Sequence, residues 1–136
     1  MISALLALFF LSASAIHVYW AAGGRSGTGA VLPEVDGKPL RTPSAGTTGL
    51  VAFLFAAVAA LVLGHAGLFP LPLPPPWPGR LLKGIAAIFA LRAVGEFNYL
   101  GFFKRVRGSR FARLDTLLYS PLCAAVACGL WAISRS

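Results

Sequence analysis

Acidic residues are scarce in this sequence, which holds four Asp and Glu residues among 136, against twelve Lys and Arg. Charged residues of both signs make up 12% of the chain, about half the share that is usual in soluble domains. The chain also lacks a nucleophile elbow, a metal-binding helix motif and a phosphate-binding loop. These absences argue against a soluble domain and against the enzymes that such motifs identify.

The two cysteines, Cys123 and Cys128, do not indicate redox or zinc chemistry. They are five residues apart, which places them on different faces of one helix, so an internal disulfide is not expected. Neither belongs to a Cys-x-x-Cys pair. We interpret them as small apolar residues that fill space.

What the sequence has in abundance is apolar residues, which make up 57% of the chain. They gather in four runs of about 20 residues, the length that a helix needs to cross a bilayer. The runs are Ile2–Ala22, Gly49–Phe69, Leu81–Phe103 and Leu114–Ile133. We therefore expect an all-α integral membrane protein of the four-helix bundle class, with residues 1–136 as a single transmembrane domain. A long Gly/Pro-rich loop, Gly23–Ala45, should connect its first two helices.

The first run resembles a signal peptide in the small residues that follow its apolar stretch. However, no Lys or Arg precedes it, and Tyr19 and Trp20 fit the aromatic belt at a membrane surface. We favour an uncleaved helix. His17 lies within this helix, where two interpretations remain open: a neutral His bonded to a neighbouring group, or a functional ligand or proton carrier.

In the third run, Arg92, Glu96 and Tyr99 fall on one helix face if the helix continues to Phe103. Arg92 would then lie near the middle of the bilayer, at a cost of about 2.5–3.5 kcal/mol on insertion scales. Pairing with Glu96 would reduce that cost. The pair is either purely structural or the polar floor of a buried site.

The basic turn Lys104–Arg113 precedes the fourth run. Arg110 and Arg113 can fold inward to pair with Asp115 or Glu96, because the guanidinium binds a carboxylate with two bonds. Asp115 suits a helix N-terminus. Pro121 should kink the helix, or else open it, which would leave too few residues to span.

Most basic residues flank the apolar runs, so we expect anionic lipid headgroups, rather than nucleic acid, as partners. Eight basic residues lie in the first and third loops: Arg25, Lys38, Arg41, Lys104, Arg105, Arg107, Arg110 and Arg113. Three lie on the opposite side: Arg80, Lys83 and Arg135. The positive-inside rule then predicts a multi-pass cell-membrane protein with cytoplasmic basic loops and both termini outside.

Two stretches carry a family resemblance. RAVGEFNYLGFFKRVRGSRFARLDTLLYSPL, residues 92–122, resembles the signature region of domain-of-unknown-function family 3995, small bacterial integral membrane proteins. HVYWAAGGRSG, residues 17–27, is similar to the first motif of that family. The resemblance implies a four-helix membrane protein with no assigned activity. The family pattern has a basic residue near Asn98 and often Asp in place of Glu96, so the resemblance defines no fixed charge pattern here.

With four spans, the ends of helices one and three and the starts of helices two and four lie on the same side of the membrane. The polar residues at these four positions therefore come together. The candidate pocket consists of His17, Tyr19, Trp20, Arg92, Glu96, Tyr99, Arg110, Arg113, Asp115 and Tyr119. Such convergence indicates a site for a lipid-like or other small amphiphilic molecule.

Two alternatives stay open: a membrane enzyme that uses Glu96 or Asp115 with His17 as acid and base on a lipid or quinone-like substrate, and a structural subunit. His17, Glu96 and Asp115 are a poor ligand set for a metal, and none is expected. The sequence identifies no cofactor. Whether the chain forms a homo-oligomer is also left open.

Overall fold

The computed structural model describes all residues from Met1 to Ser136 and is mostly helical. Its long helices are α1 (Ile2–Ala21), α3 (Ala45–His65), α4 (Trp77–Val94) and α6 (Ser120–Ile133), the last preceded by α5 (Arg110–Leu114) and a π-helical turn, Asp115–Tyr119. The loop between α1 and α3 holds a one-turn helix, α2 (Thr28–Val31), and two short antiparallel strands, β1 (Glu34–Val35) and β2 (Lys38–Pro39). This small ribbon is the one departure from an all-α chain.

Three helices are long and apolar enough to cross a membrane, as judged by length and composition. They are Ile2–Ala21, Ala45–His65 and Arg110–Ile133. α4 has 18 residues and carries three basic ones, Arg80, Lys83 and Arg92, so it is not among them. Large apolar side chains cover the outer surface, for example Phe53 at 68% exposure and Leu117 at 78%. Apolar exposure on this scale is typical of a protein whose outer faces meet lipid.

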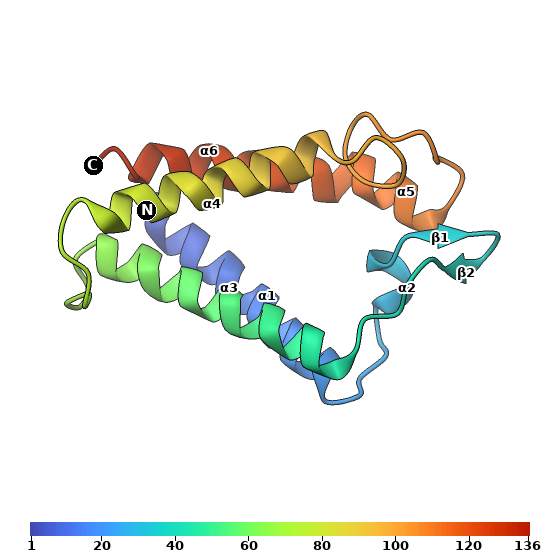
Figure 1. The fold of residues 1–136 in the computed structure, drawn as a ribbon, viewed down its shortest axis with the longest axis horizontal. Coiled ribbons are helices and arrows are strands. Elements are labelled where there is room, and N and C mark those ends of the chain that lie inside the picture. Colours follow the sequence, from blue (N-terminus) through green and yellow to red (C-terminus); the bar gives the residue numbers. More distant parts are fainter.

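The four long helices form two antiparallel pairs, α1 with α3 and α4 with α6 (Figure 1). The pairs meet at the end of the molecule where both chain termini lie, and they diverge toward α2, α5 and the β ribbon. The molecule is therefore wedge-shaped and is not packed as a bundle over its whole length. Segments α2 and α5 contact each other and close the wide end.

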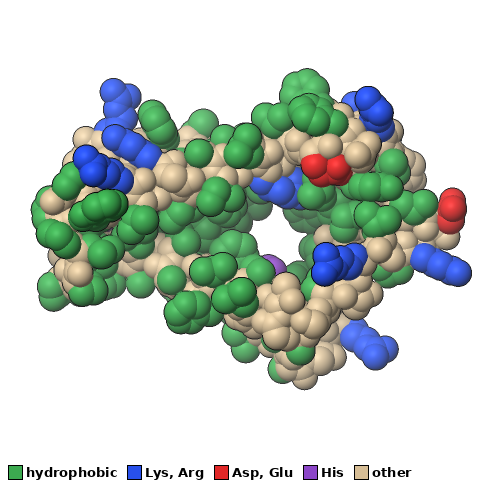
Figure 2. Space-filling model, in the orientation of Figure 1, with side chains coloured by type: hydrophobic (Ala, Val, Ile, Leu, Met, Phe, Trp, Pro, Cys, Tyr) green, Lys and Arg blue, Asp and Glu red, His purple; other side chains and the backbone are tan.

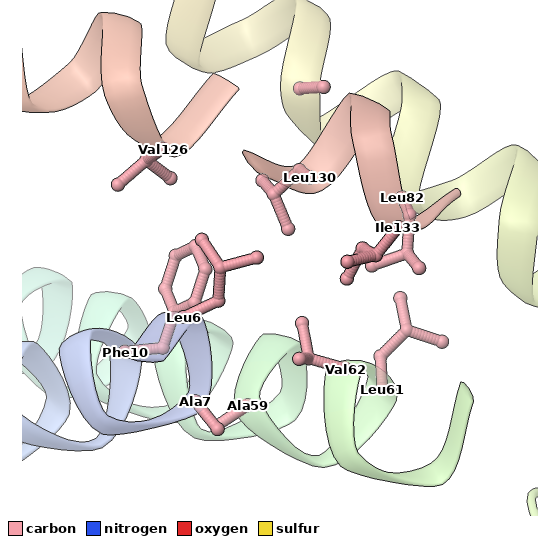
Figure 3. Close-up of a cluster of buried hydrophobic side chains, with 11 residues drawn as sticks. Leu6, Ala7, Phe10, Ala59, Leu61, Val62, Leu82, Val126, Leu130 and Ile133 are labelled. Carbon is pink, nitrogen blue, oxygen red and sulfur yellow. The ribbon is translucent and has the colours of Figure 1, made fainter. Parts of the chain in front are cut away.

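The apolar core lies where the two pairs meet and draws residues from all four long helices (Figure 3). Phe10, Val62, Leu82 and Leu130 are fully buried there. His65, at the end of α3, bonds through Nε2 to the carbonyl oxygen of Ile133 at 3.0 Å. At this narrow end the pairs are held by side-chain packing, which is the main source of helix association in lipid.

Within the first pair, small residues allow α1 and α3 to approach closely. Ala52 and Ala59 are buried, and Ser14 Oγ donates a hydrogen bond to the carbonyl oxygen of Ala52 at 2.7 Å. The sequence predicts a stripe of small residues on this helix, Ala52, Ala56, Ala60 and Gly64. Ala52 is buried as expected, whereas Ala60 is exposed and its neighbour Ala59 is buried in its place.

Two helix boundaries differ from the apolar runs for identifiable reasons. α3 starts four residues early, at Ala45, because Ser44 Oγ accepts the N–H of Thr47 at 3.1 Å and caps the helix. The third run was expected to be helical to Phe103, and this is wrong: α4 ends at Val94. Gly95 follows with φ at +88°, outside the helical region.

The fourth helix is continuous from Arg110 to Ile133. Ser109 Oγ caps it by accepting the N–H of Ala112 at 3.0 Å. The disturbance expected at Pro121 lies ahead of it and is separated from it by one residue, as the π-helical turn Asp115–Tyr119. Proline lacks an N–H, and a wider preceding turn accommodates its ring. The alternative that Pro121 opens the helix is wrong.

Two glycines that follow α4 generate a stability prediction. A Cβ on Gly95 would lie 1.8 Å from the carbonyl oxygen of Leu100, and one on Gly101 would lie 2.3 Å from that of Val94. Both have positive φ. Gly95→Ala and Gly101→Ala should each lower the free energy of unfolding by ~1–3 kcal/mol, measured in detergent micelles. Gly108→Ala, whose Cβ meets nothing within 4 Å, is the control; equal losses in all three would contradict this account.

Candidate functional site

Asp115 is the centre of a buried charge cluster at the wide end of the wedge. Its side chain is 0% exposed. Oδ1 accepts a hydrogen bond from Arg92 Nη2 at 2.8 Å, and Oδ2 accepts one from Lys104 Nζ at 2.9 Å. Oδ2 also accepts the N–H of Gly101 at 2.8 Å and the hydroxyl of Ser120 at 3.3 Å. One carboxylate thus joins α4, the loop after it, and the fourth helix.

Lys104 is the residue of this cluster that the sequence did not identify. It was counted among the loop cations, but its side chain is 1% exposed. Besides Asp115, Nζ donates to the carbonyl oxygen of Gly101 at 2.9 Å and to Thr116 Oγ1 at 2.5 Å. Nothing in the basic turn distinguishes Lys104 from Arg105. The only signal is the short turn at Gly108 and Ser109, which returns the chain toward Asp115.

The predicted partners of the charged residues were wrong. Arg92 pairs with Asp115 and not with Glu96, because α4 ends at Val94 and Glu96 no longer shares its face. Arg110 and Arg113 are exposed and form no ion pair with Asp115. Two cations on one anion leave the cluster with a net charge of about +1 at neutral pH, and the buried Arg92 Nη1 has no hydrogen-bond partner.

Glu96 has a local structural role on the surface. Its carboxylate accepts the N–H of Tyr99, and that of Leu100 at 3.2 Å. The Tyr99 hydrogen bond is the main cause that lowers the pKa of Glu96. Because the folded-state pKa is lowered, this contribution to stability is present above the ordinary glutamate pKa and is lost as the pH falls through the lowered value.

A cavity of ≈ 540 Å³ lies between the end of α1, the first loop and the start of α3. Its lining is mixed apolar and polar and includes one basic side chain. The lining residues are His17, Trp20, Gly23, Gly24, Arg25, Thr28, Val31, Leu32, Pro39, Thr42, Pro43 and Thr48. Of the predicted pocket residues, His17 and Trp20 line this cavity.

His17 is held rigidly at the wall of the cavity. Nδ1 bonds to the carbonyl oxygen of Ala13 at 2.7 Å, so in the neutral ring Nδ1 carries the proton and Nε2 is an acceptor. The ring meets Trp20 and Phe55 edge-on, at centroid distances of 5.1 and 5.2 Å. Nε2 has no partner within the chain and is free to bond a ligand.

Aromatic residues fasten the first loop above the cavity. Trp20 Nε1 donates to the carbonyl oxygen of Ser26 at 2.9 Å, and Tyr19 Oη accepts the N–H of Ser26 at 3.4 Å. Tyr119 Oη donates to the carbonyl oxygen of Ala30 at 2.9 Å. Tyr19 and Tyr119 are therefore braces for the loop and are not part of the cavity lining.

The predicted site residues thus separate into three groups. His17 and Trp20 line the cavity, Arg92 and Asp115 belong to the charge cluster, and the remaining six belong to neither. Tyr19 and Tyr119 brace the loop, Tyr99 is half-buried, and three are exposed: Glu96, Arg110 and Arg113. In the space-filling view the molecule is hollowed between the two helix pairs, with a histidine on one side of the opening and basic side chains on others (Figure 2).

The chemistry available here is binding chemistry. The oxygens of Asp115 receive four donors, and Glu96 does not line the cavity. No group of three His, Cys, Asp or Glu side chains is placed to hold a metal ion. What the cavity offers is an acceptor nitrogen, threonine hydroxyls, an arginine and an indole wall, which suit a ligand with a polar head.

Comparison with known proteins identifies a family but assigns no activity. A family model described as "Protein of unknown function (DUF3995)" matches residues 10–130. No curated protein and no solved structure matches the chain.

The charge cluster predicts a large effect from a near-isosteric change. Asp115→Asn removes the only counter-charge of the buried Lys104, and should lower the free energy of unfolding by about 3–5 kcal/mol. Glu96→Gln, on the surface, should cost far less. Lys104→Met should cost less in the Asp115→Asn background than alone, as measured by detergent unfolding. Similar losses for Asp115→Asn and Glu96→Gln would refute a central role for Asp115.

Proposed function

The chain belongs to the DUF3995 family of unknown function, and on that premise we propose that it is a four-helix integral membrane protein that binds a small amphiphilic molecule. The polar head would lie in the cavity beside His17 and Trp20, and the apolar part would lie in the opening between the helix pairs. The observation that carries the proposal is the ≈ 540 Å³ cavity with the uncommitted Nε2 of His17 at its wall. Its size falls within the range usual for ligand pockets, about 300–1,000 Å³.

Membrane insertion of all four long helices is part of the proposal. α4 is the long helix with the highest insertion cost, because it alone carries Lys or Arg residues, Arg80, Lys83 and Arg92. The carboxylate of Asp115, on the neighbouring helix, pairs with Arg92 and offsets part of that cost. The exposed apolar residues of α4, such as Ile88 at 63% and Leu91 at 70%, then meet lipid.

The charge distribution favours a ligand with an anionic head. Arg25 lines the cavity, and no acidic side chain does. The cluster of Arg92, Lys104 and Asp115 adds a further net positive charge at the same end of the molecule. Within a low-dielectric bundle such charges act over several ångströms, so a phosphate or carboxylate head is favoured over a cationic one.

The geometry of the site supports ligand binding better than it supports acid–base catalysis. Asp115 accepts hydrogen bonds from Arg92, Lys104, Gly101 and Ser120 and does not line the cavity, so it is not placed to exchange a proton with a ligand there. His17 has no carboxylate partner to orient it, since Nδ1 bonds to a backbone carbonyl. A general acid–base pair needs both groups within reach of one substrate.

The two histidines provide a matched test of ligand binding. His17→Leu removes the free acceptor of the cavity at similar volume, whereas His65→Leu changes the other histidine, at the narrow end of the wedge. Purified protein should retain an amphiphile, and His17→Leu should retain about tenfold less, corresponding to ~1.4 kcal/mol. Liquid chromatography with mass spectrometry of extracted protein measures this retention per mole of folded chain.

Folding of both variants is first checked by circular dichroism and size-exclusion chromatography. If wild-type protein retains no amphiphile, or if the two variants retain equal amounts, the proposed function fails.

Orientation forms a separate prediction. With Lys104 buried, seven basic residues remain on the surface of the first and third loops, against three on the opposite side. The positive-inside rule still places the loops in the cytoplasm. A reporter fused after Ser136 should therefore be active only as an external reporter, and a cysteine introduced by Ser26→Cys should label only from the cytoplasmic side. A cytoplasmic Ser136 would overturn the predicted orientation.

A further inference from the structure

A second candidate binding surface lies on the outside of the wedge, away from the cavity of His17. It is a groove of ≈ 460 Å³ between α4 and α6. Its floor and walls are small apolar residues from both helices, among them Ala87, Ala90 and Ala132, with Cys128. Trp131 and Arg135 complete the lining at one end.

We propose that this groove binds one acyl chain of an anionic phospholipid, whose phosphate is received by Lys83 and Arg135. The proposal rests on the membrane embedding of α4 and α6, which is part of the proposed function, and is independent of the cavity. It assigns the groove to a lipid and not to a second copy of the chain.

The cationic end of the groove is built from three side chains. Lys83 Nζ lies 5.9 Å from the ring centroid of Trp131, a cation–π distance. The indole N–H of Trp131 has no partner within the chain. About half of this residue is exposed, so its N–H is available to a ligand. Arg135 follows α6 on the same side. An ammonium, a guanidinium and an indole donor together suit a phosphate and a glycerol ester at the depth where tryptophan prefers to lie.

The distribution of acids strengthens this assignment. The four acidic residues of the chain are Glu34, Asp36, Glu96 and Asp115. All belong to the β ribbon or to the segments at the wide end of the wedge, and the visible red side chains in Figure 2 lie at that end. No acidic side chain pairs with Lys83 or Arg135, so both cations are available to attract an anion from outside the chain.

The groove extends along part of the hydrocarbon depth of one leaflet. From Lys83 to Ala90 the helix rises roughly 10 Å, and one leaflet of hydrocarbon is about 15 Å thick. The two antiparallel helices place their cations together at one end, since a Cβ on Gly79 would meet the carbonyl oxygen of Ser134 at 3.1 Å. The cations therefore lie at headgroup level and the alanines lie beneath them.

A second copy fits this surface less well than a lipid does. A two-fold contact through the groove would bring the same residues of both copies together at the same depth. Lys83 and Arg135 would then face their own equivalents without an intervening acid. Like charges across an interface oppose association, whereas a phosphate between them is attracted by both.

Trp131 can report directly on the occupant. The full chain carrying Trp20→Phe and Trp77→Phe retains Trp131 as its single tryptophan and is reconstituted in phosphatidylcholine vesicles. Either phosphatidylglycerol or phosphatidylcholine is then added with brominated acyl chains, which quench indole fluorescence on contact. Brominated phosphatidylglycerol should quench at least threefold more effectively at equal mole fraction. Lys83→Gln with Arg135→Gln should abolish this preference, whereas Arg80→Gln, whose guanidinium lies over Trp77 in the unaltered chain, should not.

The possible outcomes distinguish an anionic lipid in the groove from an unselective lipid contact and from a second copy of the chain. Equal quenching by the two lipids overturns the inference while leaving membrane embedding intact. No quenching by either lipid overturns both the inference and the embedding of α6. Oxidative cross-linking through Cys128, with Cys123→Ser, tests the second copy: a Cys128-linked dimer as the main product in vesicles would overturn the lipid assignment, and monomer is expected.

Discussion

The fully buried carboxylate of Asp115 is the interaction on which the wide end of the molecule depends. It is bonded by Arg92 at the end of α4, by Lys104 and the Gly101 N–H in the loop, and by Ser120 in the fourth helix. Desolvation of Asp115 and Lys104 costs several kcal/mol for each group, and this set of bonds offsets it, while Arg92 keeps 29% of its side chain exposed. The cluster therefore fixes three segments at once, and Asp115 supplies the counter-charge for the Arg92 side chain of α4.

The cluster also explains why the helix pairs stay apart. At the narrow end, Phe10, Val62, Leu82 and Leu130 pack α1 and α3 against α4 and α6. At the wide end, the polar groups of α4 and the fourth helix are satisfied by one another, so they do not draw α1 and α3 inward. The first loop closes this end through the hydrogen bond from Tyr119 to the carbonyl oxygen of Ala30. The cavity beside His17 is the space left beneath this loop.

The apolar runs predicted the membrane-length helices, because run length is a local property of the chain, and the two motifs at residues 17–27 and 92–122 predicted the family. Partners were not predictable in the same way. Arg92 was assigned to Glu96 because they are four residues apart, one turn of a helix. The helix ends before Gly95, which has positive φ and lies against the carbonyl of Leu100. That tertiary contact is not visible in the spacing. Lys104 was not distinguishable from its exposed neighbours, since its burial depends on how the whole loop returns to Asp115. The cavity likewise depends on the divergence of the helix pairs, which no single segment encodes.

The most direct test of this account is a pair of distances between spin labels in a cysteine-free background, with Cys123→Ala and Cys128→Ala. Double electron–electron resonance would compare labels at Leu50 and Leu91, which are exposed on α3 and α4 toward the wide end, with labels at Ala60 and Lys83 near the narrow end. The account predicts a clearly longer distance for Leu50 to Leu91 in lipid nanodiscs. Equal distances for the two pairs, as in a bundle packed over its whole length, would contradict it.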